Sequence, residues 1–200
     1  SLLFFLISCF CLRESAFCVG EPALPAGDQQ MADFSLSGFG DKGKKAWDIA
    51  GQSADIGPEV IKLNDVVSNF YGETENVKLT ADNGDFNRVE GSIHLEDNVV
   101  VTTSSGARMT TDTLDWDRKK QIVRTDSVVQ MQKNEMTIKG QGAKGFPDLN
   151  KVDLNKDVQV EILPKTPEND KKTPRKIEIT CDGPLQVDYQ KNIATLNNNV

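Results

Sequence analysis

Apolar residues recur at every second position from residue 33 to residue 162, in short runs separated by glycine, asparagine, aspartate and serine. Side chains of a β-strand alternate between two faces, so this period of two predicts strands that each have one apolar face. The segment closest to a helical spacing is EVIKLNDVVSNFY at 59–71, but its β-branched residues and flanking glycines favour a strand. The pattern predicts an all-β, antiparallel protein.

One set of apolar positions is expected to face the interior, because its members fall on the same side of each alternating run. Most are valine, isoleucine, leucine or methionine, a composition that suits either a facing sheet or a lipid chain. The positions are Phe34, Leu36, Trp47, Ile49, Ile61, Leu63, Leu79, Ile93, Leu95, Val99, Val101, Leu114, Trp116, Val129, Met131, Met136, Ile138, Val152, Leu154, Val158 and Val160.

Glycine separates several of the apolar runs, and its tolerance of positive φ makes it typical of tight turns. We expect hairpin turns at DKGKK (41–45), DNGDFN (82–87) and SSGAR (104–108). The strands are therefore predicted to follow one another as successive hairpins.

A short phrase is repeated along the chain. It consists of an apolar residue, any residue, Leu, any two residues, Asn or Asp, and finally Val. It occurs as IHLEDNV (93–99) and VDLNKDV (152–158), in clipped form as IKLNDV (61–66), and again as ATLNNNV (194–200). Longer copies, MTTDTLDWDRKKQIV (109–123) and ITCDGPLQVDYQKNIA (179–194), read as strand, turn and strand. Such repetition predicts a stack of similar hairpins.

The chain divides into five segments by composition. Residues 1–20 contain an apolar run, shorter than the roughly 20 residues that span a bilayer, which predicts a signal peptide or a truncated membrane anchor. Within it, LISC resembles a lipoprotein box that would acylate Cys9, although apolar residues follow directly. Residues 21–32 are expected to be a linker, 33–162 a β domain, 163–176 a proline- and lysine-rich linker, and 177–200 the first strands of a second β domain.

Composition excludes several kinds of function. With 23 Lys and Arg against 30 Asp and Glu, the chain is mildly acidic and has no basic cluster for nucleic acid. Only Cys181 lies outside the leader, and His94 is the single histidine, so we expect no disulfide, no zinc site and no cofactor.

Three carboxylates around a tryptophan, Asp112, Asp115 and Asp117, are the one candidate for a calcium site or for glycan hydrolysis. Alternation places Asp115 and Asp117, like His94, on the solvent face instead. The basic stretch at 118–120 is open to two interpretations, a hairpin turn or a contact with anionic head groups. No set of residues for nucleophilic catalysis is present, so the chain is expected not to be an enzyme.

Four stretches, taken in order, resemble the LptC family of periplasmic lipopolysaccharide export proteins. They are DFSLSGFGDKGKKAWDIAGQSADI (33–56), VKLTADNGDFN (77–87), IHLEDNVVVTTSSGARMTTDTLDWD (93–117) and MTIKGQG (136–142). The segment 177–200 resembles the opening of LptA, an OstA-like domain. Family glycines match Gly43 and Gly140, whereas Asp97, Lys156 and Asn198 stand where the family phrase has glycine, so a tight bulge is unexpected at the lysine.

The resemblance implies an open, twisted β-jellyroll shaped like a taco, whose apolar groove holds lipopolysaccharide acyl chains. It further implies partners: the inner-membrane lipopolysaccharide ABC transporter, and an LptA-like β-jellyroll bound by pairing of edge strands. The location would be the periplasm, with the N-terminal apolar segment as an inner-membrane anchor. A structural or adhesive β-repeat module of the cell envelope is the alternative, and a glycan-acting enzyme is a third.

Overall fold

The computed structural model describes residues 29–40, 43–164, 176–191 and 193–197. Their regular structure consists of β-strands, which confirms the all-β prediction. The strands are β1 (Gln29–Phe39), β2 (Lys45–Ile56), β3 (Val60–Tyr71), β4 (Asn76–Asn87), β5 (Ser92–Thr103), β6 (Arg108–Asp117), β7 (Ile122–Lys133), β8 (Met136–Gly145), β9 (Lys151–Ile162), β10 (Ile177–Cys181), β11 (Leu185–Asp188) and β12 (Ile193–Leu196).

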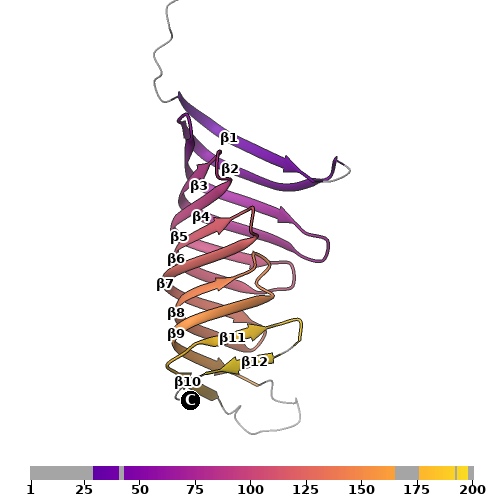
Figure 1. Cartoon of the computed structure of the whole chain (residues 1–200), viewed down its shortest axis with the longest axis vertical. Helices are drawn as coiled ribbons and strands as arrows, with labels where there is room; N and C mark the ends of the chain where they lie inside the picture. Colours follow the sequence, from indigo (N-terminus) through magenta and orange to yellow (C-terminus); the bar gives the residue numbers. More distant parts are fainter. Residues whose placement is uncertain (1–28, 41–42, 165–175, 192, 198–200) are drawn as a thin grey trace, which may run out of the picture.

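All the strands belong to one sheet, and each of β1 to β9 pairs antiparallel with the next in the chain. The outer edge of β9 then pairs with both β10 and β11, and β12 pairs with β11. Figure 1 shows the strands stacked along the long axis of the molecule, with β1 at one end and β10 to β12 at the other. The resulting open sheet is the arrangement expected for a β-jellyroll of this kind.

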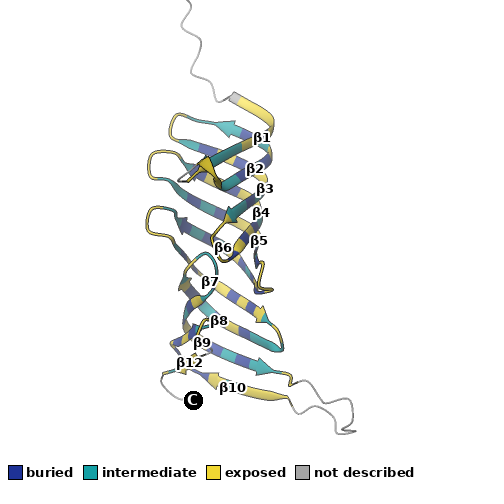
Figure 2. Ribbon diagram, turned by 90° about the vertical axis from the view of Figure 1, so that its right-hand side faces the viewer, coloured by how far each residue is buried: buried dark blue, intermediate teal, exposed yellow. Residues whose placement is uncertain are grey.

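Many of the strands bend near their middle. The register between neighbouring strands shifts at these points, for example between Glu96 and Val99 of β5, and the residues at the bend are exposed. On either side of the bend, alternate residues are buried again, and Figure 2 shows this alternation along the strands. The sheet therefore folds over on itself into two facing walls, which are the two halves of the bent strands.

The repeated phrase supplies residues for these bends. The residue just before its valine has positive φ in each described copy: 52° at Asp65, 53° at Asn98 and 52° at Asp157. Asparagine and aspartate tolerate this left-handed conformation better than other side chains with a Cβ. In the copy VDLNKDV, Lys156 directly precedes Asp157, and Asp157 is the residue with positive φ. The bulge that was not expected at the lysine is therefore made by the aspartate.

The predicted turn at 104–108 connects β5 and β6, and Gly106 has positive φ. Of the predicted turn at 41–45, residues 41–42 lie outside the described residues, and Gly43, shortly before β2, has positive φ. The predicted turn at 82–87 is wrong, because these residues lie inside β4. A Cβ at Gly84 would lie 2.9 Å from the Leu95 side chain, so this glycine makes room for core packing rather than for a turn.

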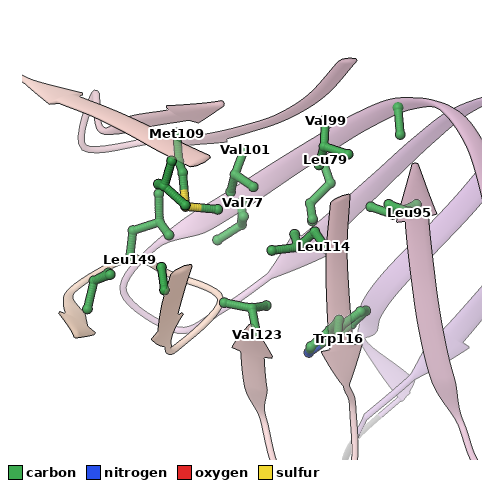
Figure 3. Packing of buried hydrophobic residues seen from close by; sticks show 14 of the residues in the cluster. Val77, Leu79, Leu95, Val99, Val101, Met109, Leu114, Trp116, Val123 and Leu149 are labelled. Atoms are coloured by element: carbon green, nitrogen blue, oxygen red, sulfur yellow. The ribbon is translucent and has the colours of Figure 1, made fainter. Parts of the chain in front are cut away.

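The core is a single apolar cluster that lies between the two walls. Residues from β1 to β11 contribute, and Figure 3 shows Val77 and Val101 pointing toward Leu114 and Val123. β1 begins at Gln29, earlier than the expected start at residue 33. The leader and its Cys9, and most of the linker at 163–176, lie outside the described residues, and within the described part no helix is long and apolar enough to cross a membrane.

Candidate functional site

The residues expected to face the interior come from nine strands, and the bends bring them onto one continuous inner surface. All are buried except Leu36, Trp47 and Met136, which are partly buried and pack against the core. Several have almost no exposed area, for example Ile49 and Leu154 at 0%. Their role toward a lipid stays a prediction.

The two walls touch each other along this inner surface. The cavity between Met109, Leu114, Leu149 and Val152 holds only about 10 Å³, which is about the smallest volume that can hold one water molecule. The interior in this structure is thus a close-packed core, and any chain that lies between the walls has to part them.

A larger space lies where the rims of the two walls meet, and we name it the mouth cleft. Its volume is about 520 Å³. One rim contributes the turn between β3 and β4, and the other contributes the turns after β6 and β8. Its lining consists of Ala46, Trp47, Phe70, Tyr71, Gly72, Glu73, Thr74, Glu75, Val77, Trp116, Arg118, Gln121, Phe146, Pro147 and Asp148.

Aromatic rings bridge the two rims at this cleft. Phe70 of β3 meets Trp116 of β6 edge to face, with ring centroids 3.8 Å apart, and Trp47 lies 6.2 Å from Phe86. The ring of Trp47 fits over Gly38, where a Cβ would lie 2.0 Å from the indole nitrogen. Such ring pairs stabilise beyond the area that they bury.

A cation covers this aromatic group. The guanidinium of Arg118 lies 3.8 Å from the Trp47 ring centroid, 5.7 Å from that of Phe86 and 5.9 Å from that of Trp116. This geometry is that of a cation–π interaction. We refer to Trp47, Phe70, Phe86, Trp116 and Arg118 as the mouth cluster.

Two donors of the mouth cluster have no acceptor within the part of the chain that the structure describes. Burial lowers the pKa of Arg118, and no carboxylate of the described residues lies within ion-pair distance of its guanidinium. The indole Nε1 of Trp116 is buried and has no hydrogen-bond partner. On the opposite rim, Glu75 is buried and accepts a hydrogen bond from the Ser105 amide at 3.0 Å, whereas Glu73 is exposed.

The sequence alone named only two residues of the mouth cluster, Trp47 and Trp116, as interior positions. Phe86 lies within the stretch 82–87 that the sequence predicts to be a turn. Phe70 continues the alternation of β3 but is not among the predicted interior positions. Arg118 lies in the turn after β6, which agrees with the prediction of a hairpin turn at 118–120. Its position over the rings of Trp47 and Phe86 carries no local sequence signal, because these two rings come from β2 and β4, far from Arg118 in the chain.

The outer face carries the polar candidates. His94 contacts Asp115 at 2.6 Å and Glu96 at 2.9 Å, and Asp115 also lies 3.8 Å from Arg124. Partial burial alone would lower the pKa of His94, but the two carboxylates outweigh it and raise the pKa above 6.5.

The carboxylates proposed for calcium or glycan chemistry do not converge on a cleft. Asp117 holds the turn after β6 through Lys120, with an Oδ2 to Nζ distance of 2.7 Å, and Asp112 is exposed near the bend of β6. Within the described ranges, no group of three or more His, Cys, Asp or Glu residues is arranged to hold a metal ion.

The two glycines matched to the family have different structural reasons. Gly43 has φ of 68° in the turn before β2, with nothing within 4 Å of an added Cβ. Gly140 lies inside β8, where a Cβ would be 2.7 Å from the Leu154 side chain. The first is required by backbone conformation and the second by close packing.

Comparison with known proteins gives one finding. A search of curated proteins finds no match to the chain. A family model described as "Lipopolysaccharide-assembly, LptC-related" matches residues 1–163, a range that ends just after β9. This family functions in lipopolysaccharide transport and is not a known enzyme family. The open antiparallel sheet, its apolar interior and the match over most of the sequence together show that the chain belongs to the LptC-related family of lipopolysaccharide-assembly proteins.

Proposed function

We propose that the chain is a non-enzymatic lipopolysaccharide-binding component of the export bridge across the cell envelope. Acyl chains lie between its two walls and pass from an inner-membrane ABC transporter toward the next β-jellyroll. The observation that carries this proposal is the continuous apolar interior, to which strands from β1 to β11 contribute. The family match supports a role in lipopolysaccharide transport but not this path.

The energetics suit a protein that both binds and releases lipid. Burying one CH₂ group is worth roughly 0.8 kcal/mol, so an acyl chain of about a dozen carbons gains on the order of 10 kcal/mol when fully covered. Parting the walls costs part of this gain, because core contacts such as those of Leu114 and Leu149 are lost. The net affinity is then low enough for the lipid to move on.

Edge strands supply the proposed contacts with neighbours in the bridge. Among the described strands β1 pairs only with β2, and it carries exposed Met31 and Phe39. An open edge of this kind accepts a strand from a partner. We place the transporter at the open edge of β1. The LptA-like unit is the segment 177–200 of this chain, whose β10 and β11 already pair with β9.

The cellular location follows from the same proposal. The domain lies in the periplasm, and the apolar segment in residues 1–20 anchors it to the inner membrane, with the five-segment division given above. This segment lies outside the described residues, so the support comes from its sequence and from the family match.

Site-specific photo-crosslinking tests the lipid path. We expect a crosslinker at Leu154 or Ile138, both buried, to capture lipopolysaccharide in cells that are exporting it. The matched controls are Asn155 and Lys139, the next residues along each strand, which are exposed on the outer face and should capture none.

The close contact of the walls favours a second candidate, a structural or adhesive β-repeat module with a dry core. If neither Leu154 nor Ile138 captures lipid while export proceeds normally, this second function replaces the first.

A further inference from the structure

The mouth cleft connects solvent with the core. Val77 and Trp116 line the cleft and also belong to the buried apolar cluster. The hydrogen-bonded ladders of the described residues join neighbouring strands, and none joins the two rims across the cleft. The rims can therefore separate by moving side chains, without breaking backbone hydrogen bonds.

The chemistry of the cleft indicates what it binds. Arg118 brings a partly desolvated cation with no carboxylate partner, and the Trp116 indole brings a buried N–H donor with no acceptor. Arg118 lies over the rings of both Trp47 and Trp116, so the cation and the indole whose N–H has no acceptor among the described residues are neighbours in the mouth cluster. A ligand with an anionic oxygen-rich group attached to apolar chains satisfies both donors and the rings at once.

We propose that the mouth cleft is the site where lipid enters the interior, with Arg118 pairing with a phosphate of the head group. The Trp116 N–H donates to an oxygen of the same ligand, and the acyl chains pass between the rings into the core. This inference rests on the proposed function and deepens it, because it assigns the place and the polarity of lipid entry. Three carboxylates also line the cleft, Glu73 and Glu75 on the opposite rim and Asp148 on the rim of Arg118, so Arg118 holds the phosphate against their repulsion.

Binding of phosphorylated lipid A to the full chain tests this site. The chain has two tryptophans, Trp47 and Trp116, and both line the cleft, so intrinsic fluorescence reports on occupancy directly. We expect Arg118→Gln to weaken binding by about tenfold or more, the usual effect of losing a charge-assisted hydrogen bond. Glu73→Gln should strengthen it by about twofold, since it removes one exposed like charge.

Three controls isolate the role of the charge. Arg124→Gln removes the same charge from the outer face, where the side chain is 71% exposed, and should leave binding unchanged. Arg118→Lys keeps the cation and should retain most of the affinity for lipid A. This variant keeps the test usable if Arg118→Gln folds poorly. Lipid A freed of phosphate should bind the native chain and Arg118→Gln equally.

The outcomes separate this inference from the function on which it rests. If the native chain binds phosphorylated lipid A and Arg118→Gln binds it equally or more tightly, Arg118 only holds the rims together and the entry site is wrong. If the native chain binds no lipid A at all, the proposed function fails as well. Loss of affinity in Arg118→Gln, with Arg118→Lys and Arg124→Gln close to native, supports the assignment.

Discussion

His94 shows how a single polar residue on the outer face is placed by its strand neighbours. In the sheet it lies directly between Asp85 of β4 and Asp115 of β6, and Asp115 lies opposite Arg124 of β7. Glu96, on its own strand, is the second hydrogen-bond partner. Opposite charges in directly paired positions stabilise a sheet, whereas like charges destabilise it. The group thus supports the pairing of neighbouring strands.

We expect the stabilisation from His94 to depend on pH. Its pKa in the folded chain is raised, so the contribution is fully present below the unfolded value of about 6.5 and is lost as pH rises through the folded pKa. His94→Gln should therefore lower the free energy of unfolding by about 0.5 kcal/mol near pH 5.5, as for an exposed ion pair, and by less near pH 8.5. Urea denaturation at both pH values measures this. An equal effect at the two pH values would show that the charge on His94 is irrelevant.

The bent strand is the element from which this molecule is built. Left-handed residues lie near the middle of three strands, at Asp65 of β3, at Asp97 and Asn98 of β5 and at Asp157 of β9, and the strands bend there. A β-bulge changes the direction of a strand and increases its twist. The repeated phrase is therefore the local signal for folding a single sheet into two walls, which explains why it recurs along the chain.

Substitution at Asp65 tests this role. Its φ is 52°, which glycine adopts freely and a β-branched residue does not. We expect Asp65→Val to cost about 1–2 kcal/mol of stability and Asp65→Gly to be nearly neutral. Lys62→Val, at an exposed position of the same strand, serves as the control. Thermal unfolding compares the three variants, and similar melting temperatures for Asp65→Val and Asp65→Gly would rule out the backbone explanation.

At the scale of the whole molecule, the chain covers one of its own sheet edges. β10 and β11 pair with the two ends of β9, and Leu185 and Val187 of β11 are buried in the common core. The family match ends at residue 163, before these strands. The C-terminal strands thus extend the sheet beyond the matched range and keep the edge of β9 from open pairing.

We expect Leu185→Asp to detach β11 from the edge of β9. Leu185 is fully buried, and a carboxylate there would be desolvated without a partner. The freed β9 edge should exchange its amide hydrogens at least tenfold faster and promote self-association, by analogy with other open edges. Gln186→Asp, at the exposed neighbouring position, should do neither. Hydrogen exchange and light scattering measure the two effects. Native protection of β9 in Leu185→Asp would mean that the cover holds without this side chain.

The sequence by itself determined most of the strands and their inward faces, and it located a bulge within the repeated phrase. It expected that bulge at Asp97 and Lys156, whereas the residue with positive φ in every described copy is the one just before the valine. Strand faces and bulges are local properties: alternation places Leu95 and Leu154 on one face, and Asn98 and Asp157 accept positive φ because of their own side chains. The same local reasoning misplaced a turn at 82–87, because Gly84 is needed for a contact with Leu95 on the next strand.

Only the tertiary structure decided which residues meet across the mouth and whether the interior is open. Trp47, Phe70, Phe86 and Arg118 are far apart in the chain, and the folding of the sheet brings them together. Strand pairing beyond the hairpin and contact between two walls depend on the summed packing of distant side chains. Periodicity along one strand carries no information about that sum, so it predicted an apolar inner surface but not its closure.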